Sequence, residues 1–445
     1  MKIIVRGAVS LGMVLLPMLA RAEQVFDLGE VARLGISGFV EEEYTRRTNV
    51  SQGLRNCVFP GDPRGVLGTQ CQPGNSRFGS GPPLHLDAIE GDLSHEFDSA
   101  WKVDARLTYR IRNGDADIYG EDFFNRNVAV SHPVYGELRG GTQLSRAWSR
   151  ADSFTYPIGL TSPWSETGAG FGLFHESLRY TAAPIELSAG KLVLEATYAT
   201  NRIRFAHNAT LQTYNEAPPR PKLGELFVQF ANQTDLIEYI FQGSQGGTQY
   251  AFGKGAFNGD VGNADNLATY VKPHQNVHIL EGDHYFTPQW KGTWGIRRSY
   301  WSGEVSQCDF VANIGGCYFS SPGFNYASDG RAHSATEWDA MAGVSWYHDA
   351  LWTYTAGLVR LNRAYTSTPT EYGQSNTATF VNFGAYRRVP EIYKDLKVYG
   401  GLNFVRFGHL GPAPMSMPSE TADGGVDPRA HQGSMGVTLG AQLVF

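Results

Sequence analysis

Side chains that could catalyse a reaction are present in this sequence, but their spacing does not match the common hydrolase and zinc motifs. Ser131 precedes His132, which places a nucleophile beside a base, yet no serine lies in a G-x-S-x-G motif. Three histidines, His274, His278 and His284, lie close together in the sequence. The first two have the spacing of the histidines in H-E-x-x-H, but no glutamate follows His274. In a strand they would lie about 13 Å apart, too far to bind one zinc ion. We therefore expect no enzymatic activity and no cofactor.

Residues 1–22 predict an export signal. Lys2 and Arg6 supply a positive start, a short apolar run follows, and Ala20-Arg21-Ala22 is an A-x-A cleavage pattern. The apolar run is too short for a membrane anchor. Cleavage would remove three positive charges and take the net charge from −6 to −9. We expect the mature chain, residues 23–445, to be exported as a single domain.

Four cysteines form two pairs that are close in sequence, each flanked by Gly, Pro and Asn. Their spacing does not match C-x-x-C and no histidine lies near either pair, which disfavours a metal site. In an exported protein the local pairs predict two loop disulfides, Cys57–Cys71 and Cys308–Cys317. Two other pairings of the four cysteines remain open.

The most regularly spaced charged residues lie where polar and apolar side chains alternate. In residues 101–111, Lys102, Arg106 and Arg110 share one row with Asp104, and the other row is apolar. This period of two predicts a β-strand with one polar and one apolar face. The same pattern recurs in residues 191–198, 337–346, 396–404 and 434–445. Aromatic residues lie at the ends of several apolar rows, as in strands that cross a membrane.

Composition excludes several other classes of protein. Aromatic residues make up 13% of the chain, which is too many for a disordered protein. The negative net charge disfavours a nucleic-acid-binding protein. Beyond the first 25 residues, no segment approaches the roughly 20 apolar residues that a membrane helix needs.

The alternating strands predict an all-β fold, an antiparallel transmembrane β-barrel. Backbone groups cannot stay unpaired in lipid, so the sheet must close on itself. Short turns alternate with long connectors rich in Gly, Pro, Asn and Ser, as in bacterial barrels with short periplasmic turns and long external loops. We expect about 16 strands, with 18 as the alternative, around an aqueous channel. The predicted strands start near residues 34, 84, 101, 126, 137, 174, 191, 224, 236, 277, 291, 335, 353, 377, 396 and 434.

Three short motifs and the C-terminus resemble the general porins of Gram-negative outer membranes. RNVAVSHPVYGELRGGTQ (residues 126–143) resembles the hairpin before their constriction loop, and ESLRY (176–180) resembles the strand after it. NSRFG (75–79) resembles an early porin motif, and Phe445 resembles the aromatic residue that ends their last strand. The four cysteines depart from the common pattern, as does a loop at 144–173 without a Pro-Glu-Phe-Gly-Gly core.

The resemblance implies that the loop at 144–173 folds into the barrel and narrows the pore. In the porin family, carboxylates of this loop face basic residues of the opposite wall. The same segment also holds Arg146, Arg150, Trp148 and Trp164, which leaves the preferred solute open. The residues expected to line the constriction are Asp152, Glu166 and Glu176 on the acidic side and Lys102, Arg106, Arg110 and Arg139 on the basic side.

The sequence thus predicts an outer-membrane porin for passive diffusion of small hydrophilic solutes and ions. Its partners would be outer-membrane lipid and, by the resemblance alone, two further copies in a homotrimer; no nucleic acid is expected. A substrate-specific channel of about 18 strands with a saturable binding site is the first alternative. A plugged structural or adhesive barrel and an outer-membrane hydrolase are the others.

Overall fold

The computed structural model describes residues 24–27, 32–48, 79–80, 84–112, 123–150, 173–200, 222–245, 274–302, 334–363, 365–366, 377–408 and 432–445. The long strands are β2 (Arg33–Arg47), β4 (Leu84–Glu96), β5 (Lys102–Arg112), β6 (Phe123–His132), β7 (Gly136–Leu144), β8 (Leu173–Thr181), β10 (Gly190–Thr200), β11 (Lys222–Ala231), β12 (Asp235–Gln245), β13 (His274–Thr287), β14 (Trp290–Ser302), β15 (Ser334–Tyr347), β16 (Trp352–Leu361), β18 (Ala378–Arg388), β19 (Leu396–Phe407) and β20 (Gly433–Val444). The short elements are β1 (Gln24–Asp27), β3 (Gly79–Ser80), β9 (Ile185–Leu187), β17 (Tyr365–Thr366) and one helical turn, α2 (Arg146–Ser149). No helix in these ranges is long and apolar enough to cross a membrane.

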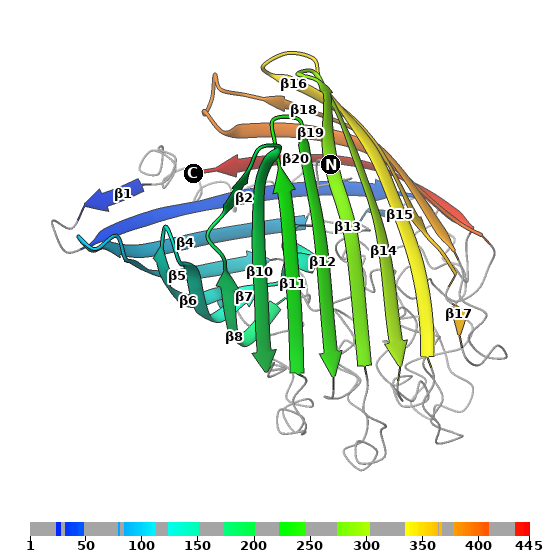
Figure 1. The fold of residues 1–445 in the computed structure, drawn as a ribbon. Helices are drawn as coiled ribbons and strands as arrows, with labels where there is room; N and C mark the ends of the chain where they lie inside the picture. The colour runs from blue at the N-terminus through cyan, green and yellow to red at the C-terminus, as the bar shows by residue number, and fades with distance from the viewer. Residues whose placement is uncertain are drawn as a thin grey trace, which may run out of the picture.

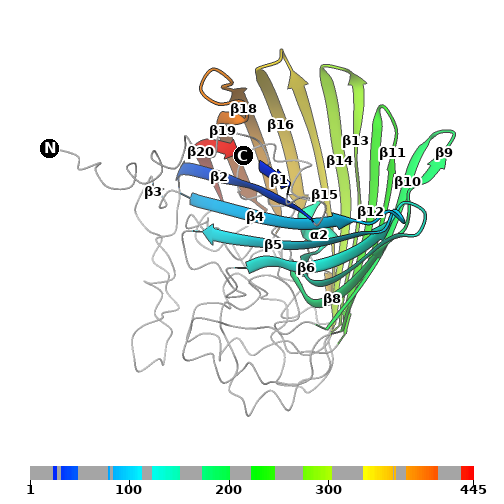
Figure 2. The same cartoon turned by 90° about the vertical axis from the view of Figure 1, so that its left-hand side faces the viewer.

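The sixteen long strands form one closed antiparallel barrel. Each pairs with the next long strand along the chain, and β2 also pairs with β20, which closes the sheet (Figure 1). Viewed from the side in Figure 2, the strands curve around an interior in which α2 lies. The prediction of an antiparallel barrel with about 16 strands is confirmed, and each predicted start lies within three residues of the observed one.

The two faces of the strands have opposite chemistry, as the alternation predicts. On β5, Leu107 and Tyr109 point outward and are exposed, whereas Thr108 between them points inward and is buried. On β16, Leu358 is exposed and Thr355 is buried. An apolar outer surface suits hydrocarbon, and a polar inner surface suits water or polar loops.

Short turns join the strands at one end of the barrel, here called the turn end; the opposite end, where the long connectors begin, is the loop end (Figure 1). Side chains hold several of these turns. Asn232 accepts hydrogen bonds from the amides of Thr234 (2.8 Å) and Asp235 (2.7 Å). Asp349 accepts two 2.7 Å bonds from the amides of Leu351 and Trp352, which lower the pKa of the Asp349 carboxyl. Turns closed this way need few residues, which keeps the turn end compact.

Aromatic rings stack along the outer surface of the turn end. The Trp346 ring lies 5.7 Å from that of Trp290 and 5.4 Å from that of Tyr354, and Tyr354 in turn stacks on Trp352 at 6.1 Å. These rings come from three neighbouring strands, β14, β15 and β16. They form the aromatic girdle expected at one edge of an apolar band.

Replacing Trp346 with alanine should destabilise the barrel more than removing an unstacked ring does. The change breaks two stacked pairs, each worth about 0.5–1.5 kcal/mol beyond the area that they bury. The measurement is the temperature at which the folded band disappears in heat-modified gel electrophoresis. Tyr198→Ala is the control, because Tyr198 is exposed and has no ring contact within the described part of the chain. Equal shifts for the two variants would contradict a stabilising role of the stack.

Candidate functional site

The chain leaves the barrel wall after a β-bulge in the pairing of β7 with β8. The register between β7 and β8 shifts between Gly141 and Gln143. Gly141 has a φ of 127°, and a Cβ there would lie 2.2 Å from the carbonyl oxygen of Arg126, so only glycine fits. Ser177 donates to the carbonyl of Gly141 (2.6 Å) and accepts from the amide of the Gln143 side chain (2.8 Å). The bulge thus aims the following residues, including α2, into the barrel.

Three glutamates of the inner wall hold the start of this inward segment; we call them, with Arg146 and Arg150, the anchor cluster. Arg146 donates two hydrogen bonds to Glu195 on β10, at 2.8 and 2.7 Å. Glu225 on β11 accepts from the backbone amide of Arg146 at 2.8 Å. Arg150 pairs with Glu238 on β12. All three carboxylates are at least 95% buried, so each needs the cation or amides that it has.

Arg179 on β8 joins the anchor cluster to the wall. Its guanidinium lies 3.1 Å from Glu195 and 3.7 Å from Glu225. It donates 3.0 Å to Thr197 and 2.6 Å to the carbonyl of Leu144, the last residue of β7. The same arginine therefore fixes both the carboxylates and the point where the chain turns inward.

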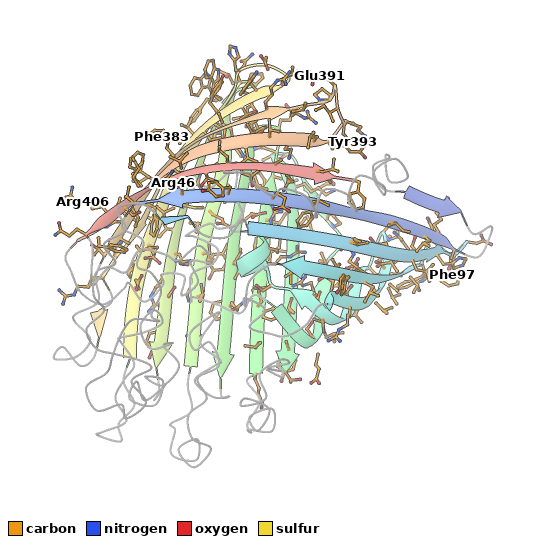
Figure 3. All side chains as sticks on the ribbon, turned by 180° about the vertical axis from the view of Figure 1, so that it is seen from behind. Arg46, Phe97, Phe383, Glu391, Tyr393 and Arg406 are labelled. Atoms are coloured by element: carbon orange, nitrogen blue, oxygen red, sulfur yellow. The ribbon has the colours of Figure 1, made fainter. Side chains whose placement is uncertain are left out.

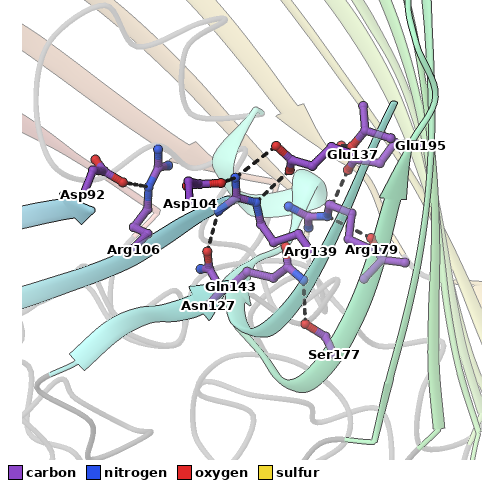
Figure 4. Close-up of polar contacts among 12 residues, drawn as sticks. Asp92, Asp104, Arg106, Asn127, Glu137, Arg139, Gln143, Ser177, Arg179 and Glu195 are labelled. Atoms are coloured by element: carbon purple, nitrogen blue, oxygen red, sulfur yellow. Dashed lines mark hydrogen bonds and ion pairs between the residues drawn. The ribbon is translucent and has the colours of Figure 1, made fainter. Parts of the chain in front are cut away.

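A second cluster of charged side chains lines the inner wall on strands β4 to β7 (Figure 4). Arg139 contacts Glu137 at 2.8 Å and Asp104 at 3.0 Å, and donates to the side-chain oxygen of Asn127 at 2.6 Å. Arg106 pairs with Asp92 at 2.8 Å. Guanidinium and carboxylate groups thus alternate along the wall.

The rest of the inner wall combines buried ion pairs with apolar side chains. Arg297 on β14 contacts Asp339 on β15 at 2.8 Å, and Lys291 contacts Asp283 at 3.0 Å. The apolar inward side chains of this sector, all buried, include Phe227, Ile240, Ile279, Met341, Val359 and Leu361. Across the part of the chain that the structure describes, no three side chains form a metal site.

The residues expected at the constriction are found in different places. Arg106 and Arg139 lie in the charged inner wall, and Lys102 is exposed at the turn end. Glu176 is exposed in the outward row of β8 and accepts a 3.3 Å bond from Thr200. Arg110 lies in β5, but its side chain is outside the described part of the structure. Asp152, Glu166, the signal at 1–22 and all four cysteines also fall outside the described residues, so these assignments stay predictions.

Sequence reasoning missed Arg179 and the three anchoring glutamates. Glu195 stands in a polar row of an alternating segment, but nothing local distinguishes it from any other lumen residue. At the described start of the loop the charges are also reversed relative to the family pattern. Here the loop supplies arginines and the wall supplies carboxylates.

Known proteins resemble this chain in fold and not in sequence. No family model matches it, and no curated protein is a significant match. Among solved structures, the anion-selective porin from Comamonas acidovorans aligns at a TM-score of 0.54 and 13% identity, over 93% of this chain and all of that one. Salmonella typhi OmpF aligns at 0.56 and 9%, over 95% of this chain and all of that one. The trimer form of OmpT from Vibrio cholerae aligns at 0.55 and 11%, over 93% and 100%. This chain therefore has the fold of the Gram-negative outer-membrane porins.

Proposed function

We propose that this protein is a porin-like channel of the Gram-negative outer membrane, through which small hydrophilic solutes and ions diffuse down their gradients. One observation carries the proposal: an arginine-bearing segment enters the barrel after β7 and is held against the inner wall by Glu195, Glu225 and Glu238. A segment fixed inside a barrel of this size narrows the aqueous channel. The apolar outer surface supports the location in a membrane.

The charged inner wall would set which solutes pass. Arg106 and Arg139 are both engaged by carboxylates, so the wall presents dipolar pairs instead of a block of one sign. Fixed charges of both signs across a water-filled gap orient polar solutes and weaken selection by net charge. Neither a catalytic residue nor a cofactor is required. The homotrimer is part of the proposal, supported by the trimeric OmpT structure of the same fold.

Planar bilayer recording tests the proposal. The refolded mature protein should produce discrete conductance steps, and a salt gradient should give a reversal potential. Changing Asp104 to asparagine should raise the anion-to-cation permeability ratio about fourfold, since one unit charge acts on an ion about 10 Å away in water with roughly 0.4 kcal/mol, with opposite sign for the anion and the cation. Glu391→Gln, at an exposed turn-end residue, should leave the ratio unchanged.

Three results would overturn the proposal or refine it. Verified folded protein without conductance would contradict a channel and favour a plugged barrel. Conductance that saturates with one solute class would favour a substrate-specific channel over a general porin. An unchanged reversal potential in Asp104→Asn would remove this part of the wall from the permeation path.

A further inference from the structure

Three arginines lie in the outward rows of one sector of the barrel, β14 to β19, near the loop end. They are Arg298 on β14, Arg360 on β16 and Arg406 on β19. Two of them end a row of apolar side chains: Arg360 follows the exposed Leu358, and Arg406 follows Phe404 and the exposed Leu402. Arg298 follows the exposed Ile296 and precedes Tyr300. Figure 3 labels Arg406 at the opposite end of the barrel from Glu391. We call these three residues the outer arginine row.

The row lies at the edge of the apolar band. Arg298 is eight residues from Trp290 and Arg360 is eight residues from Trp352, and both tryptophans belong to the turn-end girdle. For tilted strands this places the arginines about 20 Å above the girdle, whereas the full height of an apolar band is about 25 Å. An outward arginine at this depth reaches the polar layer of the lipid at little cost.

Polar and aromatic neighbours orient the guanidinium groups without neutralising them. Arg360 donates to the hydroxyl of Thr379 (2.5 Å) and to the side-chain oxygen of Asn362 (3.3 Å). Thr379 is the cross-strand neighbour of both Arg360 and Arg406, so these two arginines flank one hydroxyl. Arg298 lies 6.0 Å from the ring centre of Trp338. The row, with Trp338 and Thr379 between its arginines, thus extends over β14 to β19.

The outer arginine row also differs from the outward charges of the turn end. Arg387, on the same strand as Thr379 but at the turn end, is paired with Glu391 at 2.7 Å. Asp235 is paired there with His284 at 2.7 Å. By contrast, Arg298, Arg360 and Arg406 contact no carboxylate among the residues that the structure describes. Among the described residues, these three arginines therefore carry positive charge without a counter-charge at the loop end of β14 to β19.

We propose that the outer arginine row binds the phosphate groups of phosphorylated lipids in the outer leaflet. The inference rests on the proposed outer-membrane location with the long connectors outside. Charge complementarity selects the occupant: arginine binds phosphate with paired, charge-assisted hydrogen bonds, and the apolar rows beneath the arginines contact the acyl chains. A second copy of this chain would bring arginines against arginines, which disfavours it as the occupant.

Binding of lipid A to the folded protein in neutral detergent tests the proposal, with native mass spectrometry as the readout. The double variant Arg360→Gln/Arg406→Gln should bind lipid A about 25-fold more weakly, at about fivefold for each charge lost. Arg360→Lys/Arg406→Lys keeps both charges but not the paired hydrogen bonds, and its binding should fall between those of the unmodified protein and the double glutamine variant. Arg387→Gln, at the turn end, should bind like the unmodified protein.

The probes distinguish phosphate recognition from general lipid adhesion. Dephosphorylated lipid A should bind the unmodified protein as weakly as lipid A binds the double variant. Inorganic phosphate at millimolar concentration should not displace lipid A if the acyl chains contribute. Equal binding of lipid A to the double glutamine variant and the unmodified protein would overturn the proposal. The double glutamine variant should conduct like the unmodified protein in planar bilayers, because the row lies outside the bore. The lipid-binding test therefore does not depend on the result of the channel test.

Discussion

Replacing Glu195 with glutamine should lower the free energy of unfolding of the barrel by about 3–5 kcal/mol, the usual cost of removing one partner from a buried ion pair. Glu195 is the shared partner of Arg146 and Arg179, and its side chain is 1% exposed. Arg179, 7% exposed, would then have Glu225, at 3.7 Å, as its one remaining carboxylate partner among the described residues. Its guanidinium would remain inside the wall with weaker charge compensation.

The same change should alter the channel as well as its stability. Arg146 ties the start of the inward segment to β10, so its release should increase open-channel current noise in bilayer recordings. Arg146→Gln should cost less stability, because the Arg146 side chain is 31% exposed. If the two side chains act through one contact, the double variant should cost less than the sum of the single variants.

A matched control lies on β9, the short strand that pairs with the turn end of β10. Glu186→Gln breaks the contact of Glu186 with Lys191 at the exposed turn end, where ion pairs are worth about 0–1 kcal/mol. Urea unfolding in detergent, followed by circular dichroism, measures both variants. If Glu195→Gln and Glu186→Gln cost the same and the current noise is unchanged, the anchor cluster does not hold the inward segment.

Replacing Gly38 with valine should prevent most of the protein from folding. Gly38 lies where the last strand meets the first, and it exchanges two backbone hydrogen bonds with Phe445, at 2.8 and 2.9 Å. A Cβ at Gly38 would lie 2.4 Å from the carbonyl oxygen of Ala88 and 2.7 Å from the Phe445 ring. The ring can move, but the carbonyl is held in the sheet by β2–β4 pairing. The cost should exceed the ~1–3 kcal/mol typical of overpacking.

Gly91→Val is the control for the loss of a glycine from a strand. Gly91 lies on β4, opposite Ile36 of β2, and a Cβ there meets no atom within 4 Å. After refolding into detergent, the fraction of heat-modifiable protein should fall steeply for Gly38→Val and little for Gly91→Val. Similar folded fractions would show that the seam tolerates a side chain and that Phe445 does not depend on Gly38.

Local sequence determined the strands because a membrane barrel imposes its environment residue by residue. Leu107 and Thr108 are neighbours, yet one faces outward and the other faces the interior. This contrast is visible as polarity alone, which is why strand positions and faces follow from a period of two. The bulge at Gly141 had no comparable signal, since a glycine pair also fits a regular strand.

Tertiary structure decided which charges meet. Arg146 and Glu195 are 49 residues apart in sequence, and Arg150 and Glu238 are 88 apart. Their contact depends on the register of four successive strand pairs and on a bulge that turns the chain inward. A shift of one residue in any pair would move a glutamate to the outer face. The sequence therefore determined a barrel with a polar interior. Strand register decided that carboxylates of the wall hold the inward segment and that three arginines align on the outer surface. The reason is that only register sets which side chains are neighbours across strands.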